Sequence, residues 1–195
     1  MATTVEGLGR ATRERILDGA FEAVATFGLS RLTMDDVAHE AGLSRQSLYR
    51  YFDSKDALIQ GLVYREEETF LAGIRAAHER HGRLEDAMRE AILFCLRTAR
   101  EHPLLDRLLA SEPEVLLPFL TARGGGLVTR ARSVLEELAG RWDVAPDLIH
   151  RAADVGVRAM VSYVVTPTQD DPEDVARELA RILATAIEVR EEDVR

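Results

Sequence analysis

The chain has 195 residues, 46% of them hydrophobic, which is enough to bury a core, and its net charge of −9 argues against an overall basic nucleic-acid-binding protein. A single cysteine excludes an internal disulfide, and five scattered histidines form no cluster with metal-ligand spacing, so we expect neither a metal nor a cofactor. No apolar run approaches the roughly 18 residues that a membrane span needs, and residues 1–9 lack a signal-peptide core, so we expect a cytoplasmic protein.

The first predicted helix covers residues 12–27. Apolar side chains recur there every three or four residues, and Gly28 closes the segment. Residues 1–9 are small, polar and glycine-containing, and we expect them to form a mobile arm.

Residues 33–52 have the spacing of two short helices joined by a tight turn. Thr33 followed three residues later by Asp36 predicts a capped helix start, and Gly42 stands where the helix should end. Ser44 is a good N-cap for the second helix, whose Leu48 would pack on the first. The outer face of this helix carries arginine and glutamine, which can each pair bidentately with base edges. Any glycine-linked pair of amphipathic helices shares this spacing, so spacing alone leaves the helix-turn-helix interpretation open.

The residue types decide between these readings. The segment TMDDVAHEAGLSRQSLYRYFDSKDAL, residues 33–58, closely resembles the TetR family of bacterial transcriptional regulators. The resemblance covers about residues 10–60 and implies a helix-turn-helix domain that binds double-stranded DNA, with Lys55, the one lysine of the chain, matching the family's phosphate-contacting lysine. The expected DNA-binding residues are Thr33, Ser44, Arg45, Gln46, Tyr49, Arg50, Tyr51 and Lys55.

The first 60 residues carry seven basic and nine acidic side chains, and the rest of the chain carries 18 and 25. Neither part is basic overall. A small helix-turn-helix domain nevertheless needs only a few cations at phosphates, and Arg45, Arg50 and Lys55 lie close together in the motif.

A long helix is predicted from residue 54 to about residue 81. It holds almost no glycine and no proline, so it joins the two parts of the chain without a flexible linker. We therefore expect an all-α protein with an N-terminal helix-turn-helix domain over residues 1–53 and a larger C-terminal effector-binding and dimerisation domain over residues 54–195.

Further helices are predicted downstream, with a glycine-rich hinge at residues 124–126. Cys95 lies within an apolar stripe and is expected to be a buried structural residue. The predicted helices cover residues 84 to about 102, 104–109, from a start at 111–114 to 120, 127–141, 146–165 and 171–187.

The last two helices are the predicted dimer interface, over residues 147–165 and 172–188. The first of them is apolar around most of its circumference, so it should be buried on most sides. Two helices per subunit meeting across a two-fold axis would form a four-helix bundle, which is how the TetR family dimerises. Two alternatives remain: both helices complete a monomeric core, or residues 161–165 form a strand.

The predicted function is a homodimeric repressor that binds a palindromic operator and is released by a small-molecule effector. Release follows from the resemblance only. An apolar or aromatic effector is expected, and the candidate pocket residues are Phe70, Phe94, Thr98, Leu116, Phe119 and Tyr163. A transcriptional activator of the same fold and a non-regulatory architectural DNA-binding protein are the alternatives. An enzyme is not expected, because the sequence contains no nucleophile elbow, paired metal ligands or phosphate loop.

Overall fold

The computed structural model describes residues 2–79, 81–120 and 125–192, and these ranges contain ten helices and no strand. The all-α prediction is therefore confirmed. The chain packs as two compact units, one made of Met1–Glu68 with Pro103–Val115 and the other of Thr69–His102 with Leu116–Arg195. The division falls inside the long α4 helix (Lys55–Glu79), whereas the expected domain boundary at residues 53 and 54 stays a prediction. None of the described helices is long and apolar enough to cross a membrane.

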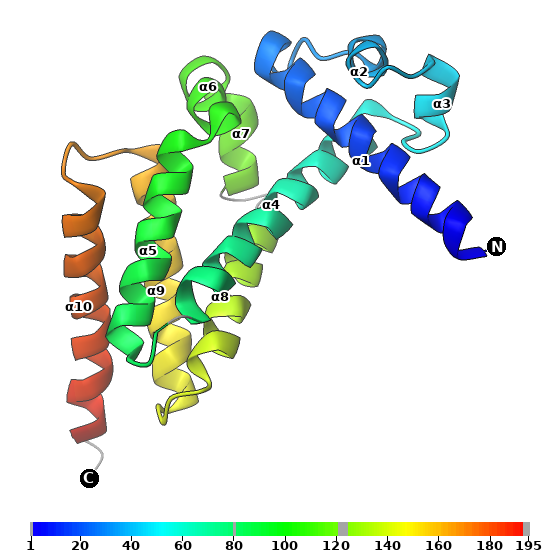
Figure 1. The fold of residues 1–195 in the computed structure, drawn as a ribbon. Coiled ribbons are helices and arrows are strands. Elements are labelled where there is room, and N and C mark those ends of the chain that lie inside the picture. The colour runs from blue at the N-terminus through cyan, green and yellow to red at the C-terminus, as the bar shows by residue number, and fades with distance from the viewer. Residues whose placement is uncertain (1, 80, 121–124, 193–195) are drawn as a thin grey trace. The chain divides into compact units, whose positions relative to one another are not determined.

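The first unit is built around the first helix, which packs against α2 and α6 (Figure 1). Its core contains the fully buried Ile16, Leu17, Val24 and Leu48. Helix α1 begins at Ala2, so the expectation of a mobile arm is wrong for residues 2–9, and Met1 lies outside the described residues. Residues 2–11 instead extend the predicted helix toward the N-terminus. The described helices that belong wholly to this unit are α1 (Ala2–Phe27), α2 (Met34–Glu40), α3 (Arg45–Tyr49) and α6 (Pro103–Ser111).

The second unit is a bundle in which α10 runs beside α5, and α8 beside α9 (Figure 1). Two apolar clusters hold it together. One joins α5, α9 and α10 around Ala176 and Ala180, and the other joins α4, α5, α8 and α9 around Leu71 and Val134. The described helices here are α5 (Leu84–Glu101), α8 (Gly125–Ala139), α9 (Pro146–Val165), α10 (Pro172–Glu192), and the C-terminal parts of α4 and of α7 (Pro113–Leu120).

Helix α9 covers the residues that the sequence predicted, so the alternative of a strand at its C-terminal end is wrong. Six residues of α9 are buried in the single chain, whereas Val155 is 55% exposed, so the expected burial of this helix on most sides stays a prediction. Of the predicted hinge glycines, Gly124 lies outside the described residues, and Gly125 and Gly126 form the start of α8. Cys95 is buried as expected, and burial raises the pKa of its thiol to about 12.

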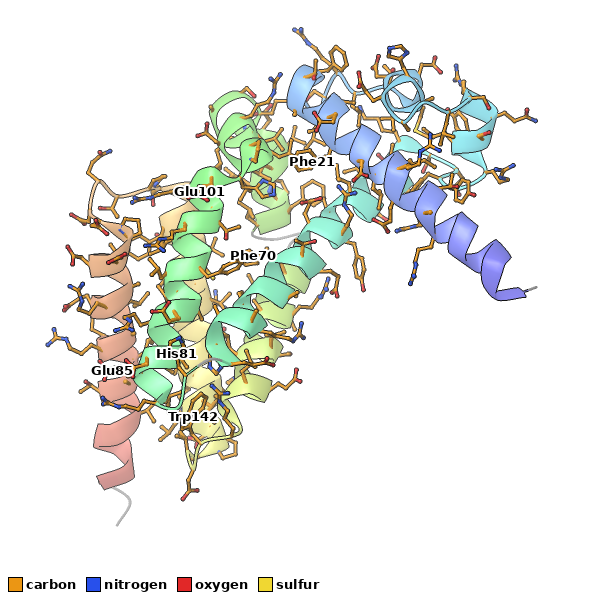
Figure 2. All side chains as sticks on the ribbon, viewed as in Figure 1. Phe21, Phe70, His81, Glu85, Glu101 and Trp142 are labelled. Atoms are coloured by element: carbon orange, nitrogen blue, oxygen red, sulfur yellow. The ribbon has the colours of Figure 1, made fainter. Side chains whose placement is uncertain are left out.

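The C-terminal end of α4 is closed by Arg141, which follows α8. Its Nη2 donates to the backbone oxygens of His78 at 2.7 Å and His81 at 2.8 Å, so one guanidinium satisfies carbonyls that the helix end leaves unpaired. Trp142 is labelled with His81 in Figure 2, and its ring centre lies 4.1 Å from the guanidinium carbon of Arg141. Its Nε1 donates to the backbone oxygen of Gly82 at 3.1 Å.

Candidate nucleic-acid interface

The first helix of the motif starts at the predicted capping box. The Thr33 hydroxyl accepts from the backbone N–H of Asp36 at 3.2 Å, and the Asp36 carboxylate accepts from the backbone N–H of Thr33 at 3.0 Å. The Thr33 hydroxyl also donates to that carboxylate at 2.6 Å. The cap therefore fixes where α2 begins and engages the Thr33 side chain.

The turn after α2 depends on Gly42, whose φ of +62° lies in the left-handed region that glycine adopts without strain. The backbone N–H of Gly42 donates to the oxygen of His39 at 3.0 Å, and that of Leu43 donates to the oxygen of Ala38 at 2.9 Å. Arg15 of α1 donates to the oxygen of Ala41 at 2.8 Å, so the first helix braces the turn.

The second helix of the motif, α3, is oriented by one buried side chain and one cap. Leu48 is fully buried, and the Ser44 hydroxyl accepts from the backbone N–H of Ser47 at 3.2 Å. With Leu48 inward, Arg45 and Gln46 at the start of the helix and Tyr49 at its end are exposed. These side chains have the donors, acceptors and ring faces that read base edges in the major groove.

Arg45 is held by two neighbours. Its Nη1 donates to Oδ2 of Asp35 on α2 at 3.0 Å, and its guanidinium carbon lies 5.5 Å from the centre of the Tyr49 ring. The pKa of Arg45 is raised above its ordinary value, first by a side-chain hydrogen bond with Tyr49 and then by the charge of Asp35. Arg45 is therefore contacted by one residue from each helix of the motif.

Arg50 and Tyr51 follow α3 and stack on each other, with the Arg50 guanidinium carbon 5.4 Å from the Tyr51 ring centre. The pKa of Tyr51 is lowered, first by a side-chain hydrogen bond with Thr12 and further by Arg50, although burial opposes the shift. Thr12 belongs to α1, so this ring links the end of the motif to the first helix.

Lys55 is the first residue of α4, and its Nζ donates to the backbone oxygen of Ser30 at 3.3 Å. The same Ser30 donates from its backbone N–H at 2.8 Å and from its hydroxyl at 2.7 Å to the carboxylate of Glu112, between α6 and α7. Desolvation raises the pKa of Glu112, but the two bonds from Ser30 and the charges of Arg107 and Lys55 outweigh it, so the pKa is lowered. Sequence reasoning missed Glu112, because no local pattern links residues 82 positions apart.

All eight predicted DNA-binding residues therefore lie in one stretch of the first unit, from the start of α2 to the start of α4. The candidate pocket residues lie elsewhere, in the second unit. Phe70 on α4, labelled in Figure 2, and Phe94 on α5 have ring centres 5.8 Å apart. Leu116 is buried, whereas Thr98, Phe119 and Tyr163 are partly buried, and Tyr163 packs against the cluster that joins α5 to α10.

Comparison with known proteins identifies the family. Residues 16–62 match "Bacterial regulatory proteins, tetR family", and residues 84–185 match "Bacterial Tetracyclin repressor, C-terminal domain". The chain belongs to the TetR family. Among its TetR relatives, the HTH-type transcriptional regulator AlkX of Mycobacterium tuberculosis is 30% identical over 179 residues, which are 88% of this chain and 82% of the relative.

Solved structures agree with this family assignment. The TetR-family repressor AlkX from Dietzia sp., described as implicated in biodegradation of n-alkanes, is 30% identical with a TM-score of 0.72, over 89% of this chain and 96% of that one. A TetR-family regulator from Streptomyces coelicolor, 17% identical, shares the fold with a TM-score of 0.67, covering 92% of this chain and 82% of that one. TetR-family proteins are DNA-binding regulators of transcription, and this chain is a regulator of that class.

Proposed function

We propose that this chain is a homodimeric repressor that acts in the bacterial cytoplasm, binds a palindromic operator and leaves it when a small molecule enters its C-terminal domain. The observation that carries the proposal is the outward face of α3, where Arg45, Gln46 and Tyr49 stand exposed on a helix that Leu48 anchors. We assign residues 1–53 to DNA binding and residues 54–195 to effector binding and dimerisation.

The eight DNA-binding residues divide into two groups. Arg45, Gln46 and Tyr49 would enter the major groove and contact base edges. The others would contact phosphates, which fix the protein on the duplex without reading its sequence. This second group consists of Thr33, Ser44, Arg50, Tyr51 and Lys55. Because Ser30 already engages Lys55, that ammonium group is held near the start of α4, where a phosphate could replace or share the carbonyl.

A homodimer through α9 and α10 is supported by apolar side chains that the single chain leaves uncovered. Val155 on α9 is 55% exposed and Ile182 on α10 is 54% exposed, and the two helices are neighbours in the second unit. Apolar residues exposed on adjacent helices are typical of a surface that another subunit covers. Two copies of residues 147–165 and 172–188 would form the four-helix bundle, and the dimer would present two α3 helices about 34 Å apart to successive faces of the major groove.

The proposed effector is apolar. The cluster of α4, α5, α8 and α9 consists of aliphatic side chains and Cys95, with Phe70 and Phe94 packed against it. His78 is the one buried polar side chain among the described residues. An interior of this kind offers little to a sugar or a nucleotide. The n-alkane connection of the Dietzia relative agrees with a hydrocarbon ligand. Thr98, Leu116, Phe119 and Tyr163 complete the proposed lining.

Release requires that the effector bind more tightly to the arrangement that does not bind DNA, since equal affinity for both arrangements shifts nothing. The test is a selection of bound fragments from random duplex DNA by the purified protein at two salt concentrations, repeated with an added n-alkane. Enrichment of one inverted repeat that survives the higher salt, and its loss with the alkane, are the expected results. Binding of similar strength to every duplex would instead indicate an architectural protein. Enrichment that the alkane leaves unchanged would contradict only the choice of effector.

A further inference from the structure

One ion pair lies on the surface that the proposed function assigns to DNA. Asp35 in the first turn of α2 accepts from Nη1 of Arg45, the first residue of α3, at 3.0 Å, and each of the two side chains is 62% exposed. The ring of Tyr49, one turn further along α3, lies under the same guanidinium. Arg45 is therefore restrained by a carboxylate from one helix of the motif and by an aromatic ring from the other.

This pair has little consequence for folding, because exposed ion pairs are screened by water and salt and contribute little to stability. It also opposes general attraction to DNA, since a carboxylate on this surface repels phosphates. Any favourable effect of Asp35 on DNA binding must therefore act through Arg45. A long side chain loses conformational entropy when it binds DNA. A partner that restrains the side chain before binding lowers this entropic cost.

The donors that remain on Arg45 match one base. The bond to Asp35 uses an N–H of Nη1, whereas the donors of Nε and Nη2 point in parallel along one edge of the guanidinium plane. Guanine presents two acceptors, N7 and O6, side by side in the major groove, whereas adenine presents N7 beside an amino donor. An arginine restrained in this way favours guanine over adenine at one position.

We propose that Asp35 is a specificity-determining residue, which positions Arg45 to read one guanine in each half of the operator. The inference rests on the proposed DNA-binding function and adds a role for a residue outside the predicted contact set. Asp35 lowers the affinity for unrelated duplexes through its charge and raises the preference for guanine at one base pair. Specific and non-specific binding therefore respond to its removal in opposite directions.

The experiment compares Asp35→Asn, which keeps the shape and removes the charge, with Asp35→Ala, Arg45→Ala and the double variant Asp35→Asn/Arg45→Ala. The matched control is Glu40→Gln, which removes one charge from the exposed C-terminal end of the same helix. Each protein is used as the full chain. Selection from random duplexes gives its base preferences, titration of the selected site and of an unrelated duplex gives both affinities, and thermal melting checks its fold.

Wild-type protein should prefer guanine at one position per half-site, and Arg45→Ala should abolish that preference. Asp35→Asn should reduce the preference at the same position by roughly three- to tenfold, a part of the roughly five- to 150-fold that one bidentate pair supplies. Its affinity for the unrelated duplex should rise, because a carboxylate that repels phosphates is removed. The double variant should lose no more specificity than Arg45→Ala alone, because both changes act through one side chain. Glu40→Gln should leave the base preferences unchanged.

Equal weakening of Asp35→Asn on selected and unrelated duplexes would overturn the inference, since Asp35 would then act only on the fold of α2. An unchanged guanine preference, or a change at a position that Arg45→Ala leaves intact, would overturn it as well. If Asp35→Ala melts early, Asp35→Asn alone decides. If the wild-type protein selects no sequence, the proposed function itself is contradicted. If the wild type selects a site and Asp35→Asn has the same base preferences, only this inference is contradicted.

Discussion

Gly19 on α1 lies where another side chain would collide with the backbone of the turn. A Cβ placed there would be 2.7 Å from the backbone nitrogen of Ala41 and 3.0 Å from its Cβ, and backbone cannot move aside as a flexible side chain can. We predict that Gly19→Ala destabilises the protein by about 1–3 kcal/mol, as overpacking does, although alanine is the better helix former. Urea unfolding followed by circular dichroism measures the change.

The control for this substitution is on the same helix. A Cβ at Gly9 would meet nothing within 4 Å, so Gly9→Ala gains helix propensity without a clash and should not lower the stability. If Gly19→Ala unfolds at the same urea concentration as wild type, α1 does not pack as closely on the turn as the structure indicates.

Lys55 gives a prediction about salt. We expect Lys55→Ala to weaken binding to all duplexes alike and to flatten the dependence of log affinity on log salt by about one unit, because one phosphate contact is lost. Lys55→Arg keeps the charge and should retain most of the slope. Titrations of one selected and one unrelated duplex at several salt concentrations measure both effects. A slope unchanged in Lys55→Ala would take this residue out of the proposed contact set.

The site residues that the sequence predicted are those with local signals. The capping box of Thr33 and Asp36 and the cap at Ser44 depend on partners three residues away, and a short spacing is visible in a sequence. Asp35 with Arg45 and Ser30 with Glu112 are contacts between different helices or loops. Their pairing is set by how the helices pack, which the periodicity of one helix does not encode.

At the scale of the helices, apolar periodicity predicted where most of them lie, and proline or a capping residue marked most starts. Helix α9 begins at the predicted Pro146 and ends at the predicted Val165. The N-terminal extension of α1 was missed because residues 1–9 contain two glycines, which are poor helix formers. Pro118 lies inside α7, and the helix runs past it to Leu120.

The end of α4 carries a prediction about pH. His78 is 2% exposed, its Nδ1 has no hydrogen-bond partner among the described residues, and its ring meets Trp142 edge-on with centres 5.1 Å apart. Burial first, and then the charges of Arg141 and His81, lower the pKa of His78 from 6.5 to about 4. The folded state therefore holds this ring neutral at a pH where the unfolded chain protonates it.

Because the pKa of His78 is lower in the folded state than in the unfolded state, its contribution to the free energy of unfolding is complete above pH 6.5. That contribution is lost as the pH falls toward 4. At about 1.4 kcal/mol per pKa unit, the loss approaches about 3 kcal/mol. Urea unfolding between pH 7.5 and 4.5, followed by the fluorescence of Trp142, the one tryptophan, measures it. His78→Phe keeps the edge-on packing and should reduce the pH dependence, whereas His39→Phe on the exposed side of α2 should not. Equal pH dependence in wild type and His78→Phe would contradict the prediction.

At the scale of the whole molecule, the sequence did not predict which segments make up the first unit. Helix α6 follows the first helix of the second unit in the chain, yet it packs with α1, where Arg107 donates to the backbone oxygen of Thr26 at 2.9 Å. The chain thus leaves its N-terminal unit after Glu68 and returns to it at Pro103. No composition shift marks this return, because α6 is amphipathic like its neighbours.

The proposed dimer makes a prediction about the whole assembly. Across a two-fold axis each exposed apolar residue is used twice, so Ile182→Glu would place two carboxylates in one interface without partners. We expect this variant to be monomeric, with the mass of the 21.7 kDa chain, where wild type has twice that mass by light scattering. Binding to the inverted repeat should weaken toward that of a single half-site, because the second α3 is no longer tethered to the first.

The matched control is Tyr64→Glu, which places the same charge at a residue on α4 that is equally exposed, 55%, but lies in the first unit. It should remain dimeric. A dimeric Ile182→Glu with a dimeric wild type would move the interface away from α10, since a buried charge at its centre could not be accommodated. A monomeric wild type would leave Val155 and Ile182 exposed in solution, and the two half-sites of an operator would then have to be read by chains that meet only on the DNA.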